Sequence, residues 1–214
     1  MILSSGRSYV FVHIPKTGGT SLAAALEARA MRDDILIGDT PKARRRRQRL
    51  AALKPRGRLW KHSTLSDIDG VLDPDELERM FVFTLVRNPW DRMVSYYNWL
   101  RTQSFAHPDV AFAQDLNFDA FLAEAEVAER FRRAPASSYV MDATGVIRCN
   151  LFIRLEHFAE DAVPLFDHLG FDFQLPRLNA SARDRDYRAY FNPTTRQRVA
   201  EICAEDIARF KYAF

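Results

Sequence analysis

Seven residues near the start of the chain combine a lysine, two adjacent glycines and three hydroxyl side chains: Pro15-Lys16-Thr17-Gly18-Gly19-Thr20-Ser21. An apolar run, Tyr9–Val12, precedes them and an alanine- and leucine-rich stretch follows. This order predicts a strand, a tight turn and the N-terminus of a helix. A helix N-terminus binds anions because its first amides point outward and the helix dipole favours negative charge. We therefore expect a site for a phosphate-like group, to which Lys16 adds a positive charge. The plain alternative is an ordinary turn in which the glycines only permit tight geometry.

The position of the lysine argues against a nucleoside triphosphate site. A Walker-type loop places its lysine after the second glycine, whereas Lys16 precedes Gly18 and Gly19. Enzymes that use such loops also need a carboxylate for Mg²⁺, commonly at the end of an apolar strand. Here the apolar run Phe81–Val86 is followed by Arg87. Positive charge stands where a metal site requires negative charge, so a Mg²⁺-dependent kinase is the disfavoured alternative and no metal site is predicted.

A second motif begins at Arg87 and reads Arg87-Asn88-Pro89-Trp90-Asp91-Arg92-Met93-Val94-Ser95-Tyr96-Tyr97. Pro89 suits the first turn of a helix. The guanidinium of Arg87 offers a planar fork to a phosphate, and Ser95 offers a hydroxyl. The alternative is a surface helix whose aromatic residues pack into the core. With both motifs at the ends of neighbouring strands, the sequence predicts a ligand that carries two separated anionic groups.

The remaining pattern predicts the elements that position these motifs. We expect strands at Tyr9–Ile14, Arg58–Lys61, Phe81–Val86 and Asn150–Leu155. We expect helices at Thr20–Ala30, Pro89–Thr102, Phe118–Arg133, Glu160–Leu169 and Pro193–Phe210, a further helix start at Asp73-Pro74, and loops at Gln103–Asn117 and Ala134–Gly145. Strands that alternate with helices predict an α/β fold. The expected architecture is a three-layer sandwich with a mostly parallel central sheet and a P-loop-like strand–turn–helix anion site, in a single domain over residues 1–214.

Composition narrows the class of protein. A hydrophobic content of 47% with 28% charged residues is ordinary for a globular protein. Cys149 and Cys203 lie far apart in sequence and have no histidine at metal-ligand spacing, which argues against a disulfide framework or a zinc site. No run approaches the roughly 18 apolar residues of a membrane span. These features predict a cytoplasmic protein without a membrane span.

The net charge of +3 conceals a strong asymmetry along the chain. The segment Lys42–Lys61 contains ten basic residues and no acidic one, whereas the rest of the chain carries 21 basic and 28 acidic residues. Because the basic character is local, nucleic acid is not an expected partner. The default interpretation of such a segment is a solvated face. The alternative is a surface that binds an anionic acceptor, such as a uronic-acid-containing or sulfated glycan.

The two motifs resemble those of a known family. Pro15–Ser21 resembles the 5′-phosphosulfate loop of sulfotransferases that use 3′-phosphoadenosine 5′-phosphosulfate (PAPS), and Arg87–Tyr97 resembles their 3′-phosphate motif. The likeness is greatest to the branch of carbohydrate sulfotransferases with bacterial relatives. It covers the first hundred residues well and continues in weaker pieces, which include Arg154–Phe158, Leu178–Ser181 and the tail Asp206–Phe214.

The resemblance implies a sulfuryl transfer from PAPS, as co-substrate, to a hydroxyl acceptor. The likeness to the carbohydrate branch implies that this acceptor is a carbohydrate. The resemblance also implies that the phosphosulfate is held by Pro15, Lys16, Thr17, Gly18, Gly19, Thr20 and Ser21, and the 3′-phosphate by Arg87 and Ser95. Asn179, Ser181 and Arg183 fall where the family often closes a loop over the nucleotide. Lys16 would act as the catalytic charge that follows the leaving phosphate. The adenine-binding residues are not predicted.

An attacking hydroxyl must lose a proton, which a histidine near neutral pKa accepts well. Of the five histidines, His62 is the candidate base because it follows the expected Arg58–Lys61 strand. The alternative is a hydrogen-bonded structural histidine. His13, inside the strand before the loop, is expected to be structural. A third class of function, a non-catalytic module that binds anionic glycans through Lys42–Lys61, would leave both anion motifs without a use.

Overall fold

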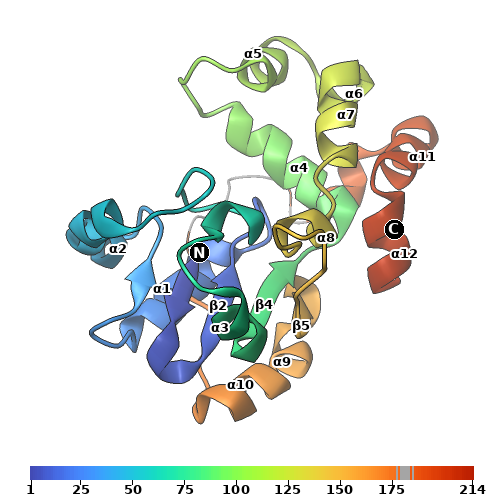
Figure 1. Ribbon diagram of the computed structural model, residues 1–214. Coiled ribbons are helices and arrows are strands. Elements are labelled where there is room, and N and C mark those ends of the chain that lie inside the picture. The colour runs from blue at the N-terminus through green and yellow to red at the C-terminus, as the bar shows by residue number, and fades with distance from the viewer. Residues whose placement is uncertain (177, 179–183, 185) are drawn as a thin grey trace. The chain divides into compact units, whose positions relative to one another are not determined.

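The computed structural model describes residues 1–176, 178, 184 and 186–214. They divide into two compact units (Figure 1). The first unit comprises Met1–Val86 and Ala136–Leu178, and the second comprises Arg87–Pro135 and Asn179–Phe214. The expected single domain over residues 1–214 stays a prediction.

The first unit is built on a five-stranded sheet, whose strands in chain order are β1 (Ile2–Ser4), β2 (Tyr9–Val12), β3 (Ile35–Leu36), β4 (Phe81–Val86) and β5 (Leu151–Arg154). Their spatial order is β3-β1-β2-β4-β5. β2 runs parallel to β4 and β4 to β5, while β1 is antiparallel to both β2 and β3. Four strands therefore share one direction, which confirms an α/β fold with a mostly parallel sheet.

Helices cover both faces of this sheet. The helices of the first unit are α1 (Gly19–Ala28), α2 (Pro41–Arg46), α3 (Pro74–Arg79), α8 (Ala136–Tyr139), α9 (Phe158–Asp161) and α10 (Val163–Leu169), with 3₁₀ turns η1 (Ser5–Arg7), η2 (Arg47–Ala52), η3 (Ser66–Ile68) and η4 (Leu155–His157). Alternate residues of a strand face opposite ways. Tyr9 and Phe11 pack against α1 and α10, whereas Val10 and Val12 pack in a second cluster with η3 and the residue after α8. The first unit thus has the three layers that the sequence predicts.

The second unit is helical. Its elements are α4 (Pro89–Leu100), α5 (Pro108–Asp115), α6 (Phe118–Ala123), α7 (Ala125–Arg132), η5 (Tyr187–Tyr190), α11 (Pro193–Ile202) and α12 (Ala204–Phe210). Its core places Trp90, Met93 and Tyr97 of α4 in one cluster with Phe121 of α6 and Val199 of α11. α4 is the central element because its buried residues extend from the first turn to the last.

Two sequence-based predictions about strands are wrong. Arg58–Lys61 forms no strand, because Ser63 closes a turn on it: the Ser63 hydroxyl donates to the carbonyl of Arg58 at 2.8 Å and accepts from the amide of Trp60 at 2.9 Å. The short strands β1 and β3 were not predicted. With three and two residues, they are too short to show the period-two alternation by which a strand is recognised.

Several predicted helices and loops are divided differently. The expected helix Phe118–Arg133 breaks at Glu124, whose backbone is extended, and Pro193–Phe210 breaks at Cys203. The expected helix Glu160–Leu169 is two helices, because Pro164 has no amide proton to continue the first. The expected loops contain the short helices α5 and α8.

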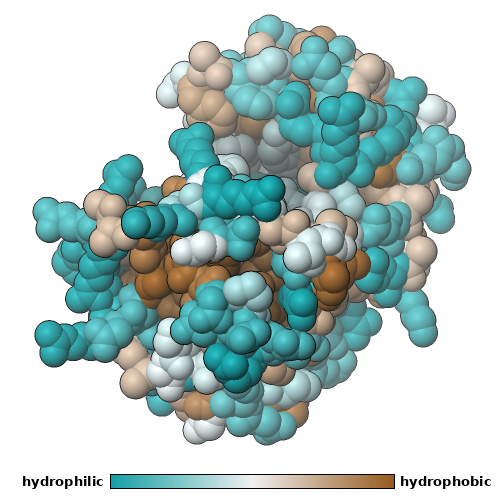
Figure 2. Space-filling model, in the orientation of Figure 1, coloured by the Kyte–Doolittle hydropathy of each residue, from teal (hydrophilic) through white to brown (hydrophobic). Residues whose placement is uncertain are grey.

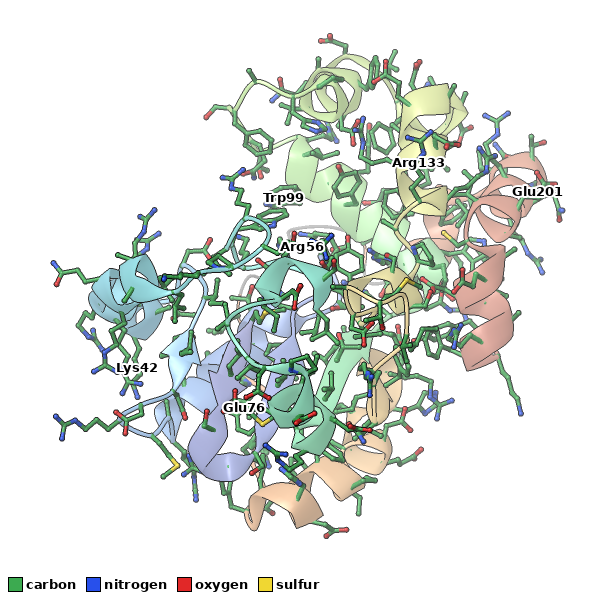
Figure 3. The ribbon with its side chains drawn as sticks, in the orientation of Figure 1. Lys42, Arg56, Glu76, Trp99, Arg133 and Glu201 are labelled. Atoms are coloured by element: carbon green, nitrogen blue, oxygen red, sulfur yellow. The ribbon has the colours of Figure 1, made fainter. Side chains whose placement is uncertain are left out.

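The predicted helix starts are confirmed in atomic detail. The Asp73 carboxylate accepts from the amide of Glu76 at 2.7 Å, and the Glu76 carboxylate accepts from the amide of Asp73 at 3.1 Å (Glu76 is labelled in Figure 3). Asn192 and Thr195 form the same reciprocal box at the start of α11. Among the described residues, no helix has the length and apolar character needed to cross a membrane.

Candidate functional site

The turn between β2 and α1 has two residues in the left-handed backbone region. Lys16 has φ 66° and Gly18 has φ 88°. Between them, Thr17 is buried and its hydroxyl donates to the carbonyl of Ile14 at 2.9 Å, which fixes the turn from inside. Left-handed residues next to other conformations turn successive amides toward one side of the chain, which is the backbone form of an anion-binding concavity. Lys16 carries this conformation although it costs a non-glycine residue about 1–2 kcal/mol.

Both glycines of the turn are required by packing. A Cβ on Gly18 would lie 2.8 Å from Cδ1 of Leu155, and φ 88° already disfavours any other residue there. A Cβ on Gly19 would lie 2.0 Å from Cδ2 and 2.4 Å from Nε2 of His13. The glycines therefore let α1 begin directly against the His13 ring, so their presence by itself does not require a ligand.

The start of α1 adds an argument for an anion. Its N-cap is Gly18, no side chain caps it among the described residues, and its first turn holds no acidic residue. The first amides of any helix lack partners within the helix. The side chains of Lys16, Thr20 and Ser21 border this end and are each partly exposed. An oxyanion would satisfy these amides without meeting negative charge.

His62 is anchored beside this loop by a hydrogen bond to His13, the residue that follows β2. Its Nδ1 lies 2.8 Å from the carbonyl oxygen of His13, and the two imidazole rings meet edge to face with centroids 4.6 Å apart. A carbonyl oxygen only accepts hydrogen bonds, so Nδ1 donates and the neutral ring has its lone pair on Nε2. The turn that replaces the expected strand therefore still brings His62 to the residue that leads into Pro15–Ser21.

Burial holds both histidines neutral. It lowers the pKa of His62 to about 4, and the nearby positive charge of Lys61 acts in the same direction, although the hydrogen bond to His13 opposes the shift. Burial also holds the pKa of His13 well below its usual range, with His62 contributing. His13 stacks on Phe11 at a centroid distance of 5.9 Å and is 6% exposed, as a residue that packs in the interior would be. Above about pH 4, His62 is thus an uncharged group that can accept a proton.

In the second unit, Arg87 is held by the carboxylate one helical turn later. Its Nε donates to Oδ2 of Asp91 at 2.8 Å, and a second guanidinium nitrogen lies 2.6 Å from the same oxygen. Both side chains are largely buried, with 14% and 16% of their surface exposed. Sequence reasoning assigned no role to Asp91, although its i+4 spacing from Arg87 at a helix start is a recognisable signal. The ion pair fixes the direction of the guanidinium.

Ser95 lies two turns along α4 and is 8% exposed. Among the residues that the structure describes, no group hydrogen-bonds to its hydroxyl. The hydroxyl is not one of the fully buried, unpartnered side-chain atoms of the described residues, so it is accessible. It can therefore donate to or accept from a ligand oxygen.

The rest of the second motif is structural. Asn88 accepts from the amide of Trp90 at 3.1 Å, and its amide nitrogen donates to the carbonyl of Ala213 at 2.9 Å. Arg92 lies 3.7 Å from Asp206 of α12. These contacts tie the end of the chain to the start of α4.

The basic segment Lys42–Lys61 forms α2, η2 and the turn that leads to His62. Several of its charges are already engaged: Lys61 with Asp39 at 2.8 Å, Arg56 with Asp69 at 3.6 Å, and Arg46 with the carbonyl of Met31 at 2.7 Å. Lys42, labelled in Figure 3, contacts the carbonyl of Glu27. Hydrophilic side chains gather over α2 in Figure 2, as the default interpretation of a solvated face expects.

Three positions that the resemblance assigns to a loop over the nucleotide, Asn179, Ser181 and Arg183, lie outside the described residues. Leu178, just before them, donates its amide to the Ser21 hydroxyl at 3.4 Å, the long limit of a hydrogen bond. In the described part of the chain, no group of three or more histidine, cysteine or acidic side chains is arranged to hold a metal ion.

Comparison with known proteins identifies the family. A family model described as "Sulfotransferase family" matches residues 1–213. Two solved structures are similar in fold: mouse sulfotransferase SULT7A1 complexed with PAP, at 18% identity over 94% of this chain and 84% of that one with a TM-score of 0.48, and a sulfotransferase from Alicyclobacillus acidocaldarius, at 16% identity over 94% and 93% with a TM-score of 0.45. No curated protein sequence matches the chain. Because the family match spans nearly every residue, the chain belongs to the sulfotransferase family.

Proposed function

We propose that this sulfotransferase moves a sulfuryl group from PAPS to a hydroxyl group of a carbohydrate acceptor. The observation that carries the proposal is the backbone of the first turn: left-handed Lys16 and Gly18 lead into a helix that has no side-chain cap and no acidic first turn. A sulfotransferase needs a site for a phosphosulfate, and this turn has the chemistry for one.

The two motifs would bind the two anionic ends of the donor. Pro15–Ser21 would bind the 5′-phosphosulfate through backbone amides, the Lys16 ammonium and the hydroxyls of Thr20 and Ser21. Arg87 and Ser95 would bind the 3′-phosphate, since Arg87 is oriented by Asp91 and the Ser95 hydroxyl has no partner among the described residues. Asn179 and Ser181 stay a prediction from the resemblance.

The chemistry is an in-line displacement at sulfur. The acceptor oxygen forms a bond to sulfur, the bond from sulfur to the bridging phosphate oxygen breaks, and the acceptor proton passes to Nε2 of His62. Lys16 balances the negative charge that develops on the leaving phosphate. The protein mainly positions the reactants and stabilises charge, as in phosphoryl transfer.

The low pKa of His62 sets how it works as a base. At neutral pH the ring is uncharged and ready to accept a proton, but a group with a pKa of about 4 is a weak base. A bound anionic donor nearby favours the protonated form and raises this pKa. Donor binding would thus strengthen the base at the moment it is needed.

Titration of the desulfated product, 3′-phosphoadenosine 5′-phosphate, tests the donor site by calorimetry. Arg87→Ala removes a charge-assisted contact, for which we expect binding about 10- to 100-fold weaker. Arg56→Ala removes a surface arginine that pairs with Asp69 and serves as the matched control. Unchanged affinity in Arg87→Ala would refute the role of Arg87.

An activity assay in chelator and a binding assay with the bisphosphate distinguish sulfuryl transfer from the two alternative functions. Sulfuryl transfer by this site needs no divalent cation, so we expect full activity in excess chelator. A Mg²⁺-dependent kinase would lose its activity there. A non-catalytic glycan-binding module would bind glycans and not the bisphosphate.

The two free cysteines, Cys149 and Cys203, suit the reducing cytoplasm, where we propose that the enzyme acts.

A further inference from the structure

A tryptophan lies exposed next to the candidate base. Trp60 is 45% exposed, and it is the one tryptophan among the exposed large hydrophobic residues in the described part of the chain. Its ring meets the His62 ring edge to face, with centroids 5.0 Å apart and an interplanar angle of 85°. The reaction assigned to His62 gives Trp60 no role, so its exposed position calls for a separate explanation.

The surrounding turn holds Trp60 in place. Its amide donates to the Ser63 hydroxyl at 2.9 Å, and its carbonyl accepts from the amide of Ser63 at 3.0 Å. Ser63 is fully buried. The indole is therefore presented to solvent from a backbone fixed on both sides, which lowers the conformational entropy that a ligand must overcome.

The charge beside the indole is positive. The Arg58 guanidinium carbon lies 5.9 Å from the centroid of the Trp60 ring, and among the described residues Arg58 forms no ion pair. The adjacent Lys61 and Arg56 each have an acidic partner, so Arg58 is the residue of this turn whose charge is available to a ligand. An anionic group next to the indole would complement it.

An exposed indole beside a guanidinium selects a class of ligand. The flat apolar face of an indole suits a ring that presents C–H groups, and its N–H serves as a polar donor. Small aromatic alcohols bind in enclosed, mostly apolar pockets. Trp60 is instead on the surface and beside a charge, which favours one ring of an extended sugar chain that carries negative charge.

We propose that Trp60 binds the acceptor by stacking on a pyranose ring, and that Arg58 binds an anionic substituent of the same saccharide, so that a sugar hydroxyl is presented to His62. This inference rests on the proposed sulfuryl transfer and specifies its acceptor. It assigns acceptor recognition to the turn Arg58–Ser63, in addition to the base that this turn carries.

The test measures acceptor kinetics with PAPS as donor. The probes are an oligosaccharide of alternating glucuronic acid and N-acetylglucosamine, the neutral maltohexaose, 4-nitrophenol and 1-octanol. We expect the anionic oligosaccharide to be the best acceptor. Trp60→Ala should raise its KM about tenfold, as the loss of one aromatic stacking contact implies. Trp60→Phe should recover most of this loss because it keeps a flat ring.

Two further readouts separate recognition from a structural role. Trp60→Ala should leave the donor KM unchanged, because donor binding does not depend on acceptor stacking. Arg58→Ala should raise KM for the anionic oligosaccharide and reduce its dependence on salt, with little effect on maltohexaose. Met31→Ala, which removes a side chain that is 42% exposed elsewhere in the first unit, is the matched control.

Each contrary result has a distinct meaning. An unchanged acceptor KM in Trp60→Ala, or a phenol or aliphatic alcohol as the best acceptor, overturns the inference about Trp60 and leaves sulfuryl transfer intact. Tight binding of the bisphosphate with no transfer to either saccharide overturns the acceptor class alone. Absence of bisphosphate binding in the unmodified protein refutes the proposed donor site, and the inference about Trp60 fails with it.

Discussion

Gly19→Ala is the substitution for which the structure gives the clearest expectation. Alanine in place of glycine in a helix normally stabilises a protein by about 0.5–1 kcal/mol. Here the new Cβ would lie 2.0 Å from Cδ2 of His13, where ordinary contact begins at 3.4 Å. The helix or the ring must therefore move by more than an ångström. Because His13 is packed between Phe11 and His62, neither movement is free.

The cost follows from overpacking. Inserting a methyl group into a filled interior destabilises by about 1–3 kcal/mol, which outweighs the gain from helix propensity. We expect Gly19→Ala to lower the free energy of unfolding by about that amount in urea titrations. It should also weaken binding of the bisphosphate, because the first amides of α1 shift with the loop.

Two further variants make the test specific. Gly38→Ala places its Cβ 3.9 Å from Ala43, without a left-handed backbone, and should be neutral within about 0.5 kcal/mol. His13→Ala removes the ring that the Cβ meets, so Gly19→Ala should cost little in that background, with a coupling of about 1–3 kcal/mol. If Gly19→Ala is as stable as the unmodified protein and binds the bisphosphate equally well, the packing of the loop against His13 is described wrongly.

Three other predictions concern the base, the loop and a helix cap. The pH dependence of kcat/KM for the donor reports the free enzyme, and we expect it to have an acid limb near pH 4 because the rate falls as His62 is protonated. His62→Ala should lack this limb. If His62→Ala keeps near-unchanged turnover at neutral pH, another residue is the base. Lys16→Gly should abolish transfer while the free energy of unfolding changes by less than about 1 kcal/mol. Glycine removes the cost of the left-handed conformation in the folded state, and this gain offsets the greater entropy that glycine gives the unfolded chain. Retained transfer would show that the ammonium is not needed. Asp73→Ala should lower thermal stability by about 1 kcal/mol through loss of the cap on α3 and leave activity unchanged, and a loss of activity would point to an unrecognised role for α3.

Much of the fold could be predicted because its signals are local. The apolar run Phe81–Val86 forms β4 with the same bounds, and Pro89 begins α4 as expected. The failures have a physical pattern. Arg58–Lys61 has the composition of a strand, but its hydrogen bonds with the Ser63 hydroxyl fold it into a turn. The long predicted helices are interrupted at Glu124 and Cys203, and helix propensity does not predict these interruptions.

The site shows the same division. Residue types and spacing alone indicated the two anion motifs, the family resemblance and the candidates Lys16, Arg87 and His62, because these signals lie in short stretches of sequence. The sequence contained no sign that the His13 carbonyl would fix the tautomer of His62, or that the His13 ring would require Gly19.

Sequence thus determined which chemical groups this sulfotransferase has and the order in which they follow strands and helices. Tertiary structure decided which of them meet. His62 is 49 residues from His13 in the chain, and Trp60 becomes the neighbour of this candidate base through a turn rather than a strand. Contacts between distant residues depend on the packing of whole elements, and no local pattern of residues specifies that packing.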